Sequence, residues 1–158
     1  MQSRSQAGLF YFCTMKRIFT LGKKERLKSR KQIEQLFSKG KKFVVAPFRI
    51  HYLSSDHLTT HLPVAIGTPL TIQFGAGVSA KNFKRAVDRK RIKRLIREAW
   101  RLQNTGLKEK LKLSGNQLNV FFIYTAKELP DFNLIKNKVA VALKKLSDKI
   151  DENGSSNS

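Results

Sequence analysis

The chain has 158 residues, which suits one domain with one hydrophobic core. Its formal net charge is +21 and its pI about 10.5, which exceeds what solubility requires and indicates a polyanionic partner. The single cysteine, Cys13, excludes an internal disulfide and a cysteine metal site, so the composition fits a reducing, cytoplasmic location. The apolar run Leu9–Cys13 is too short to span a bilayer.

The charge divides the chain into segments. Residues 16–49 carry 12 Lys or Arg and 2 acids, residues 81–101 carry 10 and 2, and residues 50–80 carry no Lys or Arg. Two basic segments separated by a nearly uncharged stretch predict one polyanion-binding surface built from both. We expect residues 1–15 to be an extension, with translation starting at either Met1 or Met15. A single domain should follow over residues 16–150, with a disordered tail over 151–158.

The first predicted element is a short helix over residues 29–39. Ser29 and Gln32 have the spacing of a capping box, and Gly40 ends the pattern. Its apolar positions at helical spacing are Ile33, Leu36 and Phe37.

Three strands are predicted next, at residues 43–46, 48–53 and 72–79. Pro47 makes a break or bulge between the first two. Alternation places Arg49 and His51 on one face of the second strand. Its other face carries Phe48, Ile50 and Tyr52. Residues 54–71 form a connection, with a short strand at 64–66 as an option. Gly75 and Gly77 carry no side chains in the third strand, so a ligand or a neighbouring element can approach its backbone.

A long basic helix is predicted over residues 84–103. At 100° per residue its apolar side chains fall within about 120°, the width of a stripe that faces a core. These are Ile92, Leu95, Ile96, Ala99 and Leu102. The opposite side collects Lys90, Lys93, Arg94, Arg97 and Arg101. A solvated charged face is the alternative, but Glu98 is the one acid between Arg89 and Arg101, so the run lacks the i,i+4 ion pairs of such a helix. The pattern favours nucleic acid.

The chain ends with a strand over 118–125 and a last helix that Asp131 caps. The apolar run Val120–Tyr124 predicts a strand buried on both faces. The buried stripe of the last helix should be Ile135, Val139, Ala142, Leu143 and Leu146. The predicted fold is therefore α+β: a two-layer α/β sandwich with one helical layer, in the order α-β-β-β-α-β-α.

Catalytic chemistry is hard to find in this sequence. Gly75-Ala76-Gly77 lacks the rest of a dinucleotide loop or P-loop. His57 and His61 have i,i+4 spacing, but their Thr- and Pro-containing surroundings disfavour the helix that a metal site would need. Paired carboxylates, a Ser/His/Asp set and an acidic metal cluster are absent from the sequence, so phosphodiester cleavage by the polypeptide is not expected. A membrane partner is disfavoured because the basic helix is expected to direct its large apolar residues inward. Trp100 is the one large apolar residue that the pattern places suitably for a membrane interface.

These motifs resemble those of the bacterial ribonuclease P protein component. The resemblance runs from Gly75-x-x-Val78-Ser79-x-Lys81-Asn82 through Arg85-Ala86-x-x-Arg89 and on to Glu98. Arg26-Leu27-Lys28-Ser29, followed by Phe37-x-x-Gly40, resembles the family's N-terminal helix region, and the match spans about residues 19–149. The chain departs at Lys90, where the family usually has Asn, and at Ile33, where relatives often have Phe.

The resemblance implies a protein subunit that is inactive alone. In this family the catalytic RNA removes the 5′ leader of precursor tRNA with magnesium held by RNA and substrate. The resemblance also implies a left-handed crossover around the basic helix, against the usual rule. The residues it assigns to the catalytic RNA are Lys81, Arg85, Arg89, Lys90, Arg91, Lys93, Arg94 and Arg97. Those it assigns to a cleft for the single-stranded leader are Phe37, Arg49 and His51, with Ile33 as an apolar wall.

Two other classes remain open from sequence. A structural rRNA-binding protein would share the charge and the α/β layout. A DNA-binding regulator would need a short helix directly before the recognition helix, where this sequence predicts the strand 72–79. We therefore expect ribonuclease P RNA and precursor tRNA as partners, and neither DNA nor a membrane.

Overall fold

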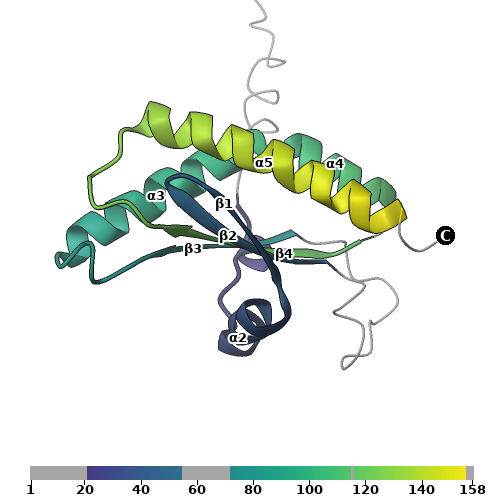
Figure 1. Cartoon of the computed structure of the whole chain (residues 1–158), viewed down its shortest axis with the longest axis horizontal. Coiled ribbons are helices and arrows are strands. Elements are labelled where there is room, and N and C mark those ends of the chain that lie inside the picture. The colour runs from purple at the N-terminus through teal and green to yellow at the C-terminus, as the bar shows by residue number, and fades with distance from the viewer. Residues whose placement is uncertain (1–20, 55–71, 115, 156–158) are drawn as a thin grey trace, which may run out of the picture.

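The computed structural model describes residues 21–54, 72–114 and 116–155 (Figure 1). The elements in chain order are a 3-10 turn η1 (Lys23–Glu25), α2 (Arg30–Lys39), β1 (Lys41–Val45), β2 (Phe48–Ser54), β3 (Ile72–Val78), α3 (Ala86–Gln103), α4 (Thr105–Ser114), β4 (Leu118–Tyr124) and α5 (Phe132–Ser155). The predictions for residues 1–20, for His57 and His61 and for a strand at 64–66 lie outside the described residues.

One four-stranded sheet organises the chain, with strand order β1-β2-β4-β3. The pairs β1–β2 and β2–β4 are antiparallel, whereas β3 and β4 are parallel. The break at Pro47 is the turn of the β1–β2 hairpin, in which Val45 pairs with Phe48. A parallel pair needs a crossover, which α3 and α4 supply between β3 and β4. The handedness of this crossover stays a prediction.

The main core lies between one face of the sheet and the helices α3, α4 and α5, which cover that face in Figure 1. The predicted inner face of β2 is confirmed, since Phe48, Ile50 and Tyr52 are buried. Opposite it the predicted stripe of α5 is buried throughout: Ile135, Val139, Ala142, Leu143 and Leu146. Asp131 accepts a hydrogen bond from the Asn133 amide at 3.3 Å, consistent with a capping role. The predicted α+β fold is therefore confirmed, with α3, α4 and α5 on one face of a single sheet, but the predicted single helical layer is not complete because α2 lies on the other face.

Helix α2 lies alone on the opposite face of the sheet (Figure 1). There Leu27, Leu36 and Leu53 form a second, smaller cluster. Because α2 covers only part of this face, β4 is not fully buried on both sides as predicted: Phe121 and Ile123 are half-buried. The helix begins after Ser29 as expected, but the Ser29 side chain makes no capping hydrogen bond. Gly40 ends it at negative φ, and a Cβ there would collide with the Leu36 carbonyl oxygen.

Three sequence predictions for the helical layer need correction. Helix α4 was not predicted, although Leu107 and Leu111 bury one of its faces. In α3, Trp100 rather than Leu102 completes the buried stripe: the Trp100 ring is fully buried and stacks on Phe74 at 4.2 Å, whereas Leu102 is 38% exposed. Helix α5 continues to Ser155, into the segment 151–158 for which composition predicts a disordered tail.

Candidate nucleic-acid interface

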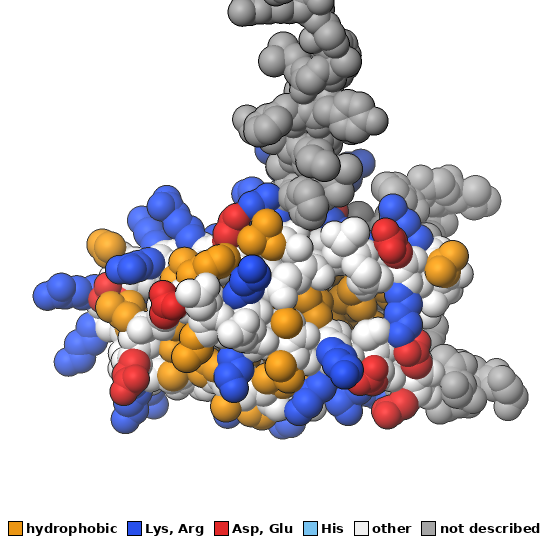
Figure 2. All heavy atoms as spheres, turned by 90° about the horizontal axis from the view of Figure 1, so that it is seen from above, with side chains coloured by type: hydrophobic (Ala, Val, Ile, Leu, Met, Phe, Trp, Pro, Cys, Tyr) orange, Lys and Arg blue, Asp and Glu red, His pale blue; other side chains and the backbone are white. Residues whose placement is uncertain are grey.

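Helix α3 presents a row of cations because its opposite side is fixed in the core. Ile92, Ile96 and Ala99 are completely buried, and this sets the rotation of the helix. The predicted cations that are consequently exposed are Lys90, Arg91, Arg94 and Arg97, and Lys93 is half-buried. Seen from above the helical layer, Lys and Arg crowd the end where Figure 1 places the start of α3, with a few Asp and Glu among them (Figure 2).

Arg89 has a different position from the rest of the row. It is half-buried, and its Nη1 donates to the carbonyl oxygens of Phe83 at 2.7 Å and Lys84 at 2.8 Å. These bonds hold the loop that leads into α3. The structure thus gives Arg89 an intramolecular positioning contact, and its predicted contact with RNA is not needed to explain why a cation is present here.

The loop before α3 is also tied to the end of the sheet. Asn82 Nδ2 donates to the carbonyl oxygens of Thr125 at 2.8 Å and Ala126 at 3.3 Å. Thr125 in turn donates from its amide and its hydroxyl to the Pro47 carbonyl, at 2.9 and 2.8 Å. These bonds join three segments that are distant in sequence. They place the exposed Lys81 and Arg85 beside the start of the α3 row.

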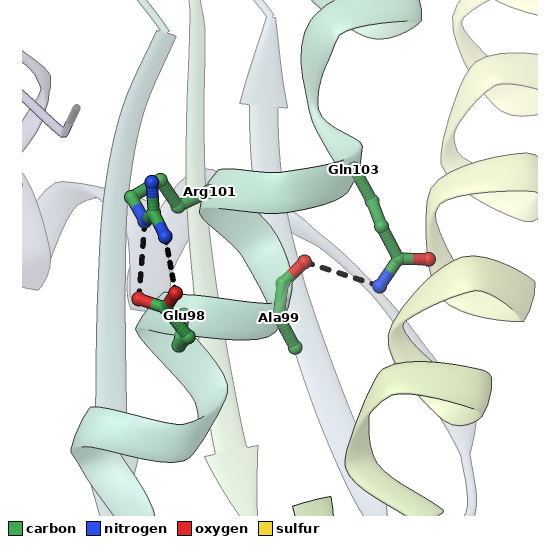
Figure 3. A network of polar contacts seen from close by, with 4 residues as sticks. All are labelled: Glu98, Ala99, Arg101 and Gln103. Carbon is green, nitrogen blue, oxygen red and sulfur yellow. Dashed lines mark hydrogen bonds and ion pairs between the residues drawn. The ribbon is translucent and has the colours of Figure 1, made fainter. Parts of the chain in front are cut away.

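The acid inside the basic run is paired at i,i+3 spacing, whereas the sequence predicts only that i,i+4 ion pairs are lacking. Arg101 donates from Nε to Glu98 Oε2 at 3.0 Å, and its Nη2 contacts Glu98 Oε1 (Figure 3). The Arg101 hydrogen bond lowers the pKa of Glu98, although burial opposes this shift. One turn away Gln103 points to the other side and donates to the Lys136 carbonyl of α5 at 3.0 Å. Arg101 is therefore engaged in a local ion pair, whereas Arg94 and Arg97 have no ion pair with the described residues.

The predicted cleft residues lie on the sheet face that carries α2. Phe37 is 41% exposed, and its ring meets His51 edge-on with 4.6 Å between centroids. Phe37 also meets Phe121 at 5.4 Å, so three rings from α2, β2 and β4 touch. Arg49, two residues before His51 on the same face of β2, is exposed beside this aromatic cluster. Phe37, Arg49 and His51 are thus brought together as predicted.

Phe121 was not predicted as a cleft residue, yet it forms the floor of this face. It pairs with Gly75 in the parallel register, and a Cβ on Gly75 would collide with its ring. A Cβ on Gly77 would lie 2.8 Å from the same ring. The two glycines therefore leave room for the Phe121 ring to lie over β3. Strand alternation could have placed Phe121 and Ile123 on one face of β4, but the β2–β4 register was needed to place Phe121 opposite His51.

The surroundings of His51 favour its neutral form. Burial lowers its pKa below the ordinary value of 6.5, and the positive charges of Arg49 and Lys42 lower the pKa further. Its Nδ1 atom is buried and finds no hydrogen-bond partner among the described residues. A neutral imidazole against Phe37 acts as an aromatic surface. Ile33, the proposed apolar wall, is half-buried and packs against the Leu27, Leu36 and Leu53 cluster, so it supports α2 from inside.

Within the described residues, groups of His, Cys, Asp or Glu side chains that could hold a metal ion are absent. The helices in that part of the chain are also too short or too polar to span a membrane. Strand β3, not a helix, leads into α3, which differs from a helix-turn-helix.

Comparisons with known proteins agree on one family. The ribonuclease P family model matches residues 21–147. The chain is 36% identical over 126 residues to the ribonuclease P protein component of Porphyromonas gingivalis, covering 79% of this chain and 85% of the relative. It is 30% identical over 128 residues to that of Chlorobium phaeobacteroides, covering 77% and 84%. The fold resembles the RNase P protein of Staphylococcus aureus with a TM-score of 0.55 and 20% identity, over 77% of this chain and 94% of the other.

Proposed function

Because the chain belongs to the ribonuclease P protein component family, and is thus a protein subunit of a tRNA-processing enzyme, we propose that it binds two RNAs through separate surfaces. The α3 row, with the loop before it, binds the ribonuclease P RNA. The α2 face binds the single-stranded 5′ leader of precursor tRNA.

The exposed cations of α3 support the first assignment. A rigid helix whose apolar side is buried keeps Lys90, Arg94 and Arg97 in one line, and phosphates along an RNA strand match such a line. Lys81 and Arg85 extend the row through the tethered loop. The remaining proposed contacts are Arg89, Arg91 and Lys93.

The aromatic cluster supports the second assignment. Single strands bind to proteins by stacking bases on exposed rings beside cations. Phe37, His51 and Phe121 supply the rings, and Arg49 supplies the charge. The half-buried Ile33 is the weakest member of this set, since its contacts are mainly with the small cluster beneath α2.

In this proposal cleavage is carried out by the RNA, with magnesium held by RNA and substrate. The two surfaces consist mainly of cations and aromatic rings, which bind and orient RNA. The proposed location is the cytoplasm, which suits a chain with one cysteine. The family match gives no support to a structural rRNA-binding protein.

Reconstitution with the ribonuclease P RNA of the same genome tests this function. We expect no cleavage of precursor tRNA by nuclease-free protein, and cleavage at a lower magnesium concentration by the protein–RNA complex than by the RNA alone. Cleavage by the protein without RNA, or the absence of any effect on the RNA reaction, would contradict the proposal.

A further inference from the structure

A groove separates α3 from the N-terminal segment 21–27. This segment lies along β3: Arg26 forms a parallel bridge with Phe74, and the Leu27 amide donates to the Phe74 carbonyl at 3.0 Å. The bridge brings Arg26 opposite the arginines of the second half of α3. The space between them has a volume of about 640 Å³ and opens to solvent.

The walls of this groove are rich in arginine. Arg26 comes from the N-terminal segment, and Arg94, Arg97 and Arg101 come from α3. Among the described residues, the structure records no side-chain partner for Arg26, Arg94 or Arg97. Two segments almost seventy positions apart in sequence thus line one cationic groove. Among the described residues that line it, Glu98 is the single acid. Such a concentration of guanidinium groups suits phosphate, which accepts paired hydrogen bonds from arginine.

The groove also has an apolar component. Leu21 lines it from the N-terminal segment and Leu95 from α3. An inorganic anion would gain nothing from these two side chains. A nucleotide strand would, because its riboses and base faces can pack on apolar surface while its phosphates meet the arginines. The combination therefore favours an RNA strand over a small anion.

Glu98 lies in this groove and is paired with one of its arginines. Its carboxylate forms an ion pair with the Arg101 guanidinium (Figure 3). The Glu98 side chain is 47% exposed and the Arg101 side chain 29% exposed. Exposed pairs of this kind are weak. A phosphate of an incoming strand can take the place of the carboxylate on Arg101, since it offers the same bidentate geometry with a diffuse negative charge.

We propose that the groove between the N-terminal segment and α3 binds a phosphodiester strand of the ribonuclease P RNA, and that this strand displaces Glu98 from Arg101. The inference rests on the proposed function and deepens it. It adds Arg26 and Arg101 to the RNA-binding residues, and it makes Glu98 a residue that opposes binding. The strand runs between two walls rather than across a single exposed helix.

Glu98→Gln in the full chain is the first test. Removing the carboxylate eliminates its repulsion of phosphate and its ion pair with Arg101, so the affinity for the ribonuclease P RNA should rise several-fold. Glu34→Gln is the matched control. It changes the net charge equally and also breaks an exposed ion pair with arginine, Arg30–Glu34, but on α2. Equal effects of the two substitutions would overturn the inference.

Arg26→Ala is the second test, with Lys24→Ala as its control from the exposed part of the same segment. If Arg26 contacts a phosphate, the slope of log affinity against log salt should become shallower by about 0.7 to 0.9. Circular dichroism verifies folding of each variant. A wild-type chain that fails to bind the RNA would overturn the proposed function as well. Wild-type binding with Arg26→Ala and Glu98→Gln indistinguishable from their controls would overturn the groove alone.

Discussion

His51 lies where the aromatic cluster meets two cations, and this makes the stability of the fold depend on pH. Its pKa is lowered in the folded chain by burial first and by Arg49 and Lys42 second. The unfolded chain therefore takes up a proton at higher pH than the folded one. The stabilising contribution of neutral His51 is fully present above its unfolded pKa of about 6.5 and is lost as pH falls through the folded pKa.

We expect the urea midpoint of the wild-type chain to fall between about pH 7.5 and about pH 5.5 more than that of His51→Gln. Glutamine cannot titrate, so the difference between the two chains isolates the imidazole from every other group. Chemical denaturation followed by circular dichroism measures both midpoints. Parallel pH profiles of the two chains would show that burial of His51 does not favour its neutral form.

Phe121 and Arg89 show at the same scale what the sequence could not reveal. The alternation of β2 was sufficient to place Arg49 and His51 on one face, but only the β2–β4 register places Phe121 opposite His51. Arg89 is indistinguishable in sequence from the cations around it. Its hydrogen bonds to Phe83 and Lys84 arise from the path of the preceding loop, which periodicity does not predict.

At the scale of elements, the strands and the helices with strong periodicity were predictable and α4 was not. The stripe of α5 is long and regular, so its buried side could be derived from spacing alone. Helix α4 follows α3 after Asn104 and has Gly106 in its first turn, which weakens the helical signal. Leu107 and Leu111 are buried because the helical layer packs over them, which the spacing of two leucines alone does not predict.

Two glycines with opposite surroundings give a prediction about these elements. A Cβ on Gly77 of β3 would lie 2.8 Å from the Phe121 ring, whereas a Cβ on Gly106 of α4 would meet nothing within 4 Å. Gly77→Ala should therefore destabilise the fold by about 1–3 kcal/mol through overpacking. Gly106→Ala should stabilise it by about 0.5–1 kcal/mol, because alanine restricts the unfolded chain and favours helix.

Urea denaturation of both variants measures these changes. Gly77→Ala should also reduce leader binding, because the ring that it displaces forms the floor of the proposed cleft. Gly106→Ala serves as the control for leader binding, since α4 lies on the other face of the sheet. Unchanged stability and leader binding in Gly77→Ala would mean that Phe121 has room to move without consequence.

At the scale of the whole molecule, the exposed cations of α3 and the exposed aromatic cluster lie on opposite faces of the sheet. Lys and Arg crowd the end of the helical layer where α3 begins, whereas Asp and Glu are spread over both ends of this face (Figure 2). The aromatic cluster lies on the opposite face with α2. A net charge of +21 attracts any RNA over long range, but this uneven distribution favours one orientation of approach.

This separation predicts that substitutions on the two surfaces should impair the binding of different RNAs. Arg91→Ala with Arg94→Ala should weaken assembly with the ribonuclease P RNA, and each lost phosphate contact should reduce the salt slope by about 0.7 to 0.9. Phe37→Ala should leave assembly nearly intact. It should reduce the preference for precursor tRNA over mature tRNA by about 1–3 kcal/mol, the contribution of one stacked base.

Competition binding with a mature tRNA and a precursor carrying a leader of about five nucleotides measures the preference. Since Phe37 contacts His51 and Phe121, its loss can also loosen α2, so circular dichroism must first show that the variant folds. Ile33→Phe is the companion variant: because it adds a ring on α2, it should maintain or improve the affinity for the leader. A leader preference that follows Arg91 and Arg94 instead of Phe37, or an equal loss of both tRNAs in Phe37→Ala, would contradict the division into two surfaces.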